Sequence, residues 1–368
     1  MKSPKTSLFQ HNFVHVLFPL VLAGFIAQAQ EQRGYFYRGV PYGSEATFNP
    51  VSVFLNGGFD ELQIYGLSNN LRDIPWAQGN EFLLKNLRDP LQQIRGYGWD
   101  LFLRNEVFPT SLNRLHMQYF PNYTLHLLGG GMTYRKLEEW YRFHEYPAPS
   151  LLSIVTTMSY HYLNELIETR NYAGINVDPI ADLFLFDPLG ILLFSADGVS
   201  EFFSTTLSFN DWSNQPAFSF APFGVRNTGQ NFVMKYPLSS SGKTSLFYHF
   251  GAFGILGLSL KTSDEESISF GAGIASKSVY TYDVNHYFVA QAIHTGPIAG
   301  LYVDRNNSLL ASLVVTDSFN DLVRVQCFPG LIPWSISPGL FFSWGQQSQF
   351  TVGITASFLP AGLGGYHP

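Results

Sequence analysis

A strict alternation of apolar and small or polar residues limits the folds open to this chain more than any other feature. In residues 349–358 every second residue is apolar, and the residues between are Gln, Thr, Gly and Ser. Residues 267–276 follow the same pattern, with Ser and Gly opposite Ile, Phe and Ala. Side chains of a β-strand point alternately to opposite faces, so both segments are predicted to be strands with one apolar face.

The composition indicates what such an apolar face meets. Aromatic residues make up 16% of the chain and charged residues 13%, about half the usual share of charge in soluble domains. No segment beyond residue 29 has the roughly 20 uninterrupted apolar residues of a spanning helix. This combination is typical of a transmembrane β-barrel, in which lipid-facing and lumen-facing residues alternate. A soluble β-sandwich also alternates, but it would not normally place so many aromatic residues beside small polar partners.

We therefore predict a mainly β fold, a transmembrane antiparallel β-barrel of about twelve strands, with ten to fourteen allowed. Residues 30–128 supply the first strands, with a long loop and one helix over 68–95. Residues 201–358 supply the C-terminal strands, and residues 359–368 form a short tail. The strand candidates are 52–59, 61–67, 97–107, 115–127, 202–209, 217–224, 229–236, 245–253, 254–261, 267–276, 284–296, 299–304, 309–316, 321–328, 336–344 and 349–358.

A helical insert over residues 129–200 separates the two groups of strands. Its helices are predicted at 132–144, 150–170 and 178–196, the last one interrupted at Asp187-Pro188. Each helix is too short for an ordinary membrane span and too apolar for bulk water. We expect the insert to plug the barrel lumen or to cap its end.

Residues 1–29 have the features of a secretory signal peptide that is cleaved. Lys2 and Lys5 form its basic start, residues 13–26 its apolar core, and Ala27-Gln28-Ala29 the small-x-small cleavage pattern. A retained N-terminal anchor is the alternative, but the apolar run is short for a membrane span. An exported barrel is expected in the outer membrane of a Gram-negative cell.

Charge and cysteine content limit the partners and the covalent links. The formal net charge of −6 argues against nucleic acid as a partner, because phosphate binding needs clustered Lys and Arg. Cys327 is the only cysteine, so no intrachain disulfide can form. The expected partners are outer-membrane lipid and other envelope proteins in a complex.

Residues 158–194 contain the candidates for chemistry. This stretch places five carboxylates and one His between apolar helical runs. Charged groups are costly in apolar surroundings unless they are paired, hydrated or bound to a cation. The pairs Asp178-Pro179 and Asp187-Pro188 suit helix N-caps that have Pro at the next position. We predict capping for Asp178, whereas Asp187 lies within an apolar run, where a functional role stays open.

The main candidates are His161, Glu165 and Glu168, whose i, i+4, i+7 spacing places them on one face of a helix. These residues together with Asp182 can bind one divalent metal ion, since imidazole and carboxylates are metal ligands. The same three residues can instead act in acid–base catalysis. The third interpretation is a polar helix face that hydrogen-bonds Ser, Tyr and Arg side chains. Other sources of a fourth metal ligand are His126, His116 and Asp178.

Two further features have structural explanations. The run Gly129-Gly130-Gly131 is expected to let the backbone turn from strand to helix. No Lys-Ser or Lys-Thr follows it, which argues against a phosphate-binding loop. The charged side chains within residues 135–142 mix both signs at helical spacing, which predicts a solvated helix face.

Three segments carry a resemblance: residues 122–131 (NYTLHLLGGG), the helix with Glu165 and Glu168, and residues 176–182 (NVDPIAD). The region from about 113 to 215 resembles parts of uncharacterised outer-membrane proteins of Bacteroidota-type bacteria. The resemblance implies an outer-membrane barrel with inserted helices, and it implies no particular activity. The helices are also similar to the membrane helices of VanZ-like proteins, an all-helical family from which the predicted strands depart.

The combined prediction is an integral outer-membrane protein that acts without catalysis, as a structural or accessory subunit of an envelope assembly or transport complex. A lumen filled by helices argues against a general porin, because diffusion needs an open aqueous channel. The first alternative is a metal-dependent barrel enzyme that acts on envelope lipids through His161, Glu165 and Glu168. The second is a gated channel for a small solute, with the carboxylates along a cation-selective path.

Overall fold

The structure is a computed structural model that describes residues 34–112, 117–169, 174–284, 288–332, 334 and 337–367. The chain divides into Met1–Gly34 and Tyr35–Pro368, and the elements below belong to the second part. The predicted signal peptide, residues 1–29, lies outside the described residues, as does the candidate ligand His116.

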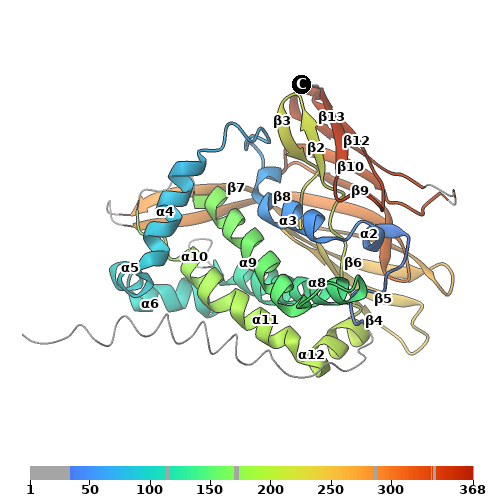
Figure 1. The fold of residues 1–368 in the computed structure, drawn as a ribbon, viewed down its shortest axis with the longest axis horizontal. Helices are drawn as coiled ribbons and strands as arrows, with labels where there is room; N and C mark the ends of the chain where they lie inside the picture. The colour runs from blue at the N-terminus through green and yellow to red at the C-terminus, as the bar shows by residue number, and fades with distance from the viewer. Residues whose placement is uncertain are drawn as a thin grey trace, which may run out of the picture. The chain divides into compact units, whose positions relative to one another are not determined.

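The strands form one sheet of 13 strands (Figure 1). Neighbouring strands pair antiparallel, except that β13 runs parallel to β2. Their order across the sheet is β1-β4-β5-β6-β7-β8-β9-β10-β11-β12-β13-β2-β3. The strands are β1 (Asn210–Asp211), β2 (Ala217–Phe220), β3 (Phe223–Arg226), β4 (Phe232–Pro237), β5 (Thr244–Phe250), β6 (Phe253–Lys261), β7 (Glu266–Val284), β8 (Phe288–Arg305), β9 (Ser308–Thr316), β10 (Asp321–Cys327), β11 (Gly339–Gly345), β12 (Phe350–Thr355) and β13 (Gly362–His367).

The two end strands, β1 and β3, do not pair with each other in the described part of the chain, so the sheet is open. Both ends meet the N-terminal region instead. The N–H of Leu71 donates to the carbonyl of Phe223 in β3 at 3.1 Å, and the Ser44 hydroxyl donates to the carbonyl of Asp211 in β1 at 3.0 Å. The predicted large antiparallel sheet is confirmed. The predicted closed barrel is not, because the end strands form hydrogen bonds with segments that are not strands and not with each other.

Most of the C-terminal strands follow the predicted alternation, although several differ in extent. β7 runs to Val284, beyond the predicted 267–276. The strands predicted at 284–296 and 299–304 are not separate, because residues 288–305 form one strand, β8, in which Pro297 stands opposite Ile274 of β7. Figure 1 shows β7 and β8, drawn in orange, extending beyond the other strands. The predicted tail contains β13, whose backbone pairs with β12 although its sequence is rich in glycine.

Helices form a second layer that is larger than the predicted insert. The three helices predicted for the insert are confirmed, and further helices lie before and after them. The helical elements are α2 (Gly43–Ala46), α3 (Pro50–Gly58), η1 (Asp60–Gln63), α4 (Trp76–Arg88), α5 (Pro90–Tyr97), α6 (Trp99–Phe102), η2 (Leu103–Val107), α7 (Tyr119–Pro121), η4 (Asn122–Gly130), α8 (Gly131–Phe143), α9 (Pro149–Glu168), α10 (Asp178–Ala181), η6 (Asp182–Phe186), α11 (Asp187–Ser195), α12 (Asp197–Glu201), η7 (Phe202–Thr206) and η8 (Gln346–Ser348).

The strands predicted for the N-terminal region are wrong, and the start of α3 gives the physical reason. The Asn49 side chain accepts hydrogen bonds from the N–H groups of Val51 and Ser52, and Pro50 occupies the first helical position. This N-cap with Pro at the next position stabilises a helix over an apolar run that by itself suits a strand. In the described residues, the predicted N-terminal strands that are helical or irregular are 52–59, 61–67, 97–107 and 115–127, and the predicted C-terminal strand 202–209 is helical or irregular as well.

An aromatic core joins the helices α8 and α11 to the sheet. Phe194 of α11 packs with Met132 of α8 and with Phe232 and Phe250 of β4 and β5. Phe209, just before β1, stacks on Phe250 with ring centroids 6.0 Å apart. These side chains are almost completely buried, so this region fixes the position of α8 and α11 on the sheet.

The charged residues of α8 were predicted to face solvent, and that prediction is wrong. The Glu139 carboxylate accepts three hydrogen bonds, at 2.8–2.9 Å, from the backbone N–H groups of residues 35–37. Lys136 donates to the side-chain oxygen of Asn210 in β1 at 2.9 Å. Arg135 is buried beside Glu139 and binds it at 3.1 Å. The helix therefore uses these charges to hold the N-terminal segment and β1 in place.

One face of the sheet exposes many large apolar side chains, while the other face is buried. Leu301 of β8 and Leu313 of β9 are exposed, whereas the next residue in β8, Tyr302, and the preceding one in β9, Ser312, are buried. Across the described residues no single helix has the length and apolarity of a membrane span. One pair meets the criterion only when joined, Asp178–Ser195 with Asp197–Thr206, and it is bent by 87°.

Candidate metal site

The candidate residues meet where several helical segments come together. Three of these segments, η2, η4 and η6, are π-helical. π-Helical turns are rare, and they occur frequently at functional sites because they displace side chains from the regular helix positions. The residues are His161, Glu165 and Glu168 on α9, Asp178 on α10, Asp182 on η6, Asp187 at the start of α11, His126 on η4, and Glu106 on η2.

Two pairs of buried carboxyl groups form hydrogen bonds within this cluster. Glu165 bonds to Asp182, and Glu106 bonds to Asp178. All four residues are buried. A hydrogen bond between two carboxyl groups requires a proton on one of them, because an ionised carboxylate only accepts.

The surroundings change the pKa values of these groups in a common direction. Burial raises the pKa of Glu106 from 4.5 to about 7. Burial, reinforced by neighbouring carboxylates, raises the pKa of Glu165, Asp178 and Asp182 well above their usual range. Burial also lowers the pKa of His161 to about 3, which keeps this imidazole neutral and leaves one ring nitrogen with a lone pair.

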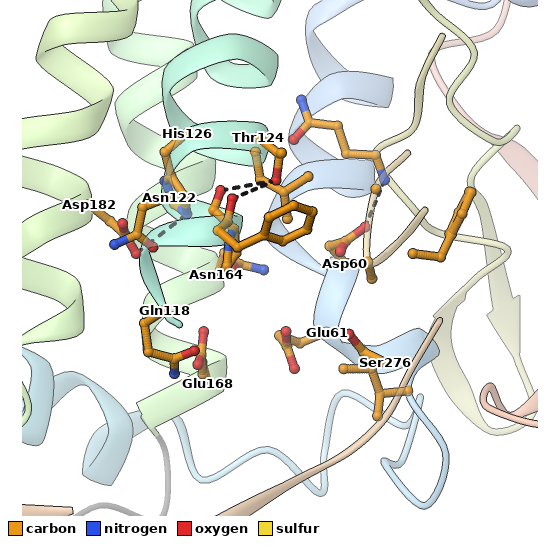
Figure 2. A pocket seen from close by; sticks show the side chains of 18 of the residues that line it. Asp60, Glu61, Gln118, Asn122, Thr124, His126, Asn164, Glu168, Asp182 and Ser276 are labelled. Carbon is orange, nitrogen blue, oxygen red and sulfur yellow. Dashed lines mark hydrogen bonds and ion pairs between the residues drawn. The ribbon is translucent and has the colours of Figure 1, made fainter. Parts of the chain in front are cut away.

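A cavity of about 410 Å³ lies beside the cluster. Its lining joins the helical layer to the sheet: His126, His161 and Asp182 line one part, and Phe253 and Ile274 of β6 and β7 line another. Figure 2 shows Asp182 beside His126, and in another part of the same cavity it shows Glu168 beside Gln118, with Glu61 opposite. A small molecule in this cavity would therefore contact both histidines and an apolar wall.

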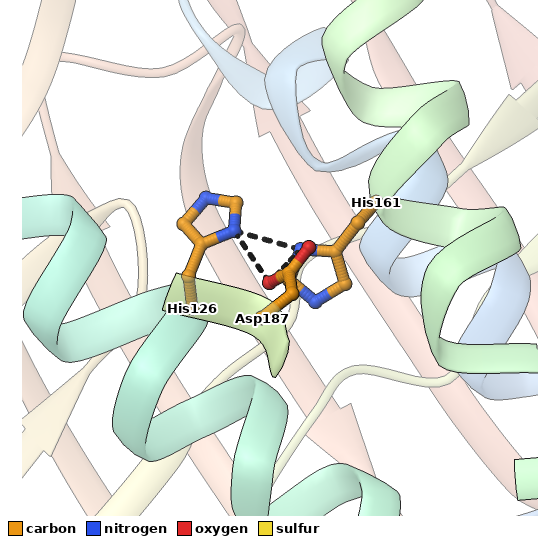
Figure 3. Close-up of side chains that lie close together, drawn as sticks. All are labelled: His126, His161 and Asp187. Carbon is orange, nitrogen blue, oxygen red and sulfur yellow. Dashed lines mark hydrogen bonds and ion pairs between the residues drawn. The ribbon is translucent and has the colours of Figure 1, made fainter. Parts of the chain in front are cut away.

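Two imidazoles and one carboxylate form the tightest group in the cluster. Nδ1 of His126 lies 2.9 Å from Oδ1 of Asp187, and Nδ1 of His161 lies 3.1 Å from the same oxygen. The two Nδ1 atoms are 2.8 Å apart. Figure 3 shows the Asp187 carboxylate between the two rings. Three potential metal-binding atoms thus converge within a triangle in the protein interior.

The other nitrogen of His126 faces a second carboxylate. Nε2 of His126 lies 3.4 Å from Oδ2 of Asp182, and Asp182 in turn bonds to Glu165. These two contacts, from His126 to Asp182 and from Asp182 to Glu165, orient the His126 ring so that its Nδ1 points toward Asp187 and His161.

The structure distributes the predicted site residues over adjoining groups. Glu165 and Asp182 are adjacent and lie near His126, whereas Glu168 lies near Glu165 and Asp178. His161 belongs to a different group, with His126 and Asp187. The predicted set of His161, Glu165, Glu168 and Asp182 therefore spans three neighbouring groups of possible ligands, and no single one contains all four.

Capping does not explain the two Asp-Pro aspartates. The N-cap of α10 is Val177, and Asp178 lies one position inside the helix, where it bonds to Glu106. At Asp187 the chain is already helical, because η6 runs into α11 without a break in helical backbone angles. The capping prediction for Asp178 is wrong, and Asp187 belongs to the His126–His161 group.

Glu106 was not among the predicted site residues, because it lies in a segment predicted as a strand. His126 was only one of several proposed fourth ligands. Comparisons with protein-family models, with curated proteins and with solved structures found no match.

Proposed function

We propose that this chain is an integral outer-membrane protein that serves as a structural or accessory subunit of an envelope assembly, with the outer face of its sheet against lipid. The observation that carries this proposal is the exposed apolar face of the sheet. A face of aliphatic and aromatic side chains costs free energy in water, about 25 cal/mol for each Å² left exposed. In a bilayer the same face meets acyl chains, and this cost is absent.

One row of side chains shows how continuous the apolar face is. Its members stand opposite one another in successive strands from β4 to β12. Apart from Leu258, which is partly buried, each of them is 37–52% exposed. The row consists of Tyr236, Leu246, Leu258, Phe270, Leu301, Leu313, Val325, Phe342 and Val352.

The opposite face supports a structural role more than an open pore. On that face Ser269, Ser312 and Gln326 are buried, as are the charged Lys235 and Arg324. A diffusion channel needs a continuous aqueous lumen. In our proposal the 13 strands form the greater part of a barrel wall in the membrane, the N-terminal region covers the gap between β3 and β1, and the helices occupy the inner side.

Labels at single cysteines test the membrane assignment. With Cys327 replaced by Ala, a fluorescent probe is attached at Leu313→Cys in the apolar row or at Ser240→Cys in the exposed turn after β4, and the protein is reconstituted into vesicles. We expect lipids with brominated acyl chains to quench the probe at position 313 and to leave the probe at position 240 unchanged. Equal quenching at both positions by a water-soluble quencher, with none by brominated lipid, would contradict the proposal.

A second candidate function is a metal-dependent enzyme that acts on envelope lipids. The observation that favours it is the cavity, which combines both histidines with an apolar wall suited to an acyl chain. Incubation of the reconstituted protein with phospholipid and divalent metal, followed by mass spectrometry of the lipids, tests it. Turnover by the unmodified protein and none by Asp187→Asn would support it, and equal product with both would exclude this site as the cause.

A further inference from the structure

We infer that His126, His161 and Asp187 bind one divalent first-row transition-metal ion, and that Asp182 positions His126 for this role. The inference concerns the buried triangle alone and holds whether or not the sheet lies in a membrane.

Protons satisfy the triangle of His126, His161 and Asp187 only with unfavourable close contacts. If one Nδ1 carries a proton, the two atoms without a proton place their lone pairs within 3.1 Å of each other. If both Nδ1 atoms carry protons, both can donate to Oδ1 of Asp187, but the two N–H groups then crowd each other because their nitrogens are 2.8 Å apart. A cation between the three atoms attracts all three lone pairs and removes this conflict.

The distances suit a metal ion. Ligands at about 2.1 Å from a metal, arranged at right angles, lie about 3 Å apart. The three distances in the triangle are 2.8, 2.9 and 3.1 Å. Two imidazoles and one carboxylate on one face of a metal leave its other positions open, and this ligand set binds ions such as Fe(II).

An unpartnered buried atom provides independent support for a missing ligand. Asp187 is 1% exposed, and its Oδ2 has no hydrogen-bond partner within the described structure. A buried carboxylate oxygen without a partner costs about 1–3 kcal/mol or more. Coordination of a cation by the Asp187 carboxylate lowers this cost, because a carboxylate can bind a metal ion through both of its oxygens.

A histidine that binds a metal through one ring nitrogen usually donates a hydrogen bond from its other nitrogen to a carboxylate or a carbonyl group. Asp182 is the carboxylate in this position for His126. Its Oδ2 faces Nε2 of His126 at 3.4 Å, on the side of the ring away from Asp187. A carboxylate in this position fixes the tautomer with the proton on Nε2 and the lone pair on Nδ1. Asp182 is therefore a positioning residue and not a ligand.

Imidazole ligands also limit the choice of metal. Mg²⁺ and Ca²⁺ prefer oxygen ligands, whereas two histidines favour Fe, Co, Ni, Cu or Zn. The cavity lined by His126 and His161 gives a route by which an ion or a small molecule can approach.

The test uses the full chain in detergent, stripped with chelator and then titrated with Co(II) and Zn(II). We expect about one equivalent to bind with d–d absorption bands in the Co(II) form, as for a site with nitrogen ligands. His161→Ala and Asp187→Asn should abolish the bands. Asp182→Asn should weaken binding by about 10–100-fold, the usual effect of an outer contact. His144→Ala, at an exposed histidine after α8, is the matched control and should bind as the unmodified chain does.

Two results would overturn the inference. One is the absence of Co(II) and Zn(II) binding by the unmodified chain, which needs no variant and so does not depend on the folding of one. The other is loss of the metal in Glu168→Gln with full retention in His161→Ala, because this outcome moves the ion to the group of Glu165, Glu168 and Asp178. Near-ultraviolet circular dichroism of each variant establishes that its fold is intact.

Discussion

At the scale of single residues, the buried cluster combines side chains from one face of α9 with side chains from η4, η6 and α11. The spacing of His161, Glu165 and Glu168 places all three beside the buried cluster. Their partners His126 and Asp187 come from other helices, and no local pattern connects residues 61 positions apart. The charges of α8 show the same limit, because mixed charges at helical spacing suit both a solvated face and a buried network.

Glu106 provides a prediction about pH at the level of one side chain. Its pKa is raised from 4.5 to about 7 by burial, so folding favours the protonated carboxyl. This stabilising contribution is complete below pH 4.5 and is lost as the pH rises through 7. We expect the metal-free protein to lose stability between pH 5 and pH 8, and Glu106→Gln to lose about 3 kcal/mol less over this range.

The measurement is denaturant unfolding in detergent, with chelator present, at pH 5, 6.5 and 8. Glu81→Gln, at an exposed position of α4, is the control and should follow the unmodified chain. His161 acts in the opposite direction below pH 6.5, because its lowered pKa stabilises the neutral form. The comparison of Glu106→Gln with Glu81→Gln cancels this contribution, and equal pH slopes for the two variants would refute the prediction.

Among the elements, the alternation identified most strands of the C-terminal half because these strands have one apolar and one polar face. The alternation did not identify the glycine-rich strand β13, and it wrongly predicted a strand where an N-cap begins the helix α3. β13 is a strand because β12 offers backbone partners, although its own residues Gly362, Gly364 and Gly365 carry no pattern. In the N-terminal region the Asn49-Pro50 cap was present in the sequence, and it is the signal that could have identified α3.

The three glycines before α8 have a different role from the predicted turn. Gly130 and Gly131 have helical backbone angles, so the chain does not turn there. A Cβ at Gly129 would lie 2.4 Å from the Phe232 ring, and a Cβ at Gly131 would lie 2.6 Å from the carbonyl oxygen of Gly190 in α11. The glycines let η4 and α8 approach α11 and the sheet closely, and this approach brings His126 to Asp187.

Gly190→Ala tests this close approach between elements. An added Cβ would lie 2.7 Å from the carbonyl oxygen of Leu127 and 2.9 Å from that of His126, so α11 must move away from η4. We expect a loss of about 1–3 kcal/mol in unfolding free energy. Weaker Co(II) binding should follow, because Asp187 lies one turn before Gly190 on α11.

Gly198→Ala is the matched control for this substitution. Gly198 lies in α12, and no atom lies within 4 Å of an added Cβ, so Ala should be neutral or slightly stabilising there. Thermal unfolding and Co(II) titration of both variants measure the difference. Unchanged stability and affinity in Gly190→Ala would show that α11 and η4 can separate without cost.

For the whole molecule, composition and alternation predicted a large sheet with an apolar outer face but not the extent of the helical layer. The helices α3 to α6 lie in a region whose apolar runs suit either helix or strand. Packing decides between them: α3 and α4 pack with α9 and β3, and α5 and α6 pack with α10 and η6. Local sequence patterns also could not predict whether the sheet closes into a barrel. It depends on which partners the end strands find, and here β1 and β3 find the N-terminal region.

The placement of the whole molecule against lipid predicts different costs for an introduced charge at different positions. Leu313 lies near the middle of β9, far from either end of its strand, whereas Leu238 is exposed in the turn after β4. In vesicles, we expect Leu313→Arg to lower the unfolding free energy by about 2–4 kcal/mol and Leu238→Arg by about 0–1 kcal/mol, because the cost of Arg on a lipid face falls from the bilayer centre to its surface. Denaturant unfolding of both variants in vesicles measures this difference. Equal small losses, together with improved solubility of Leu313→Arg without detergent, would mean that the outer face of the sheet meets water.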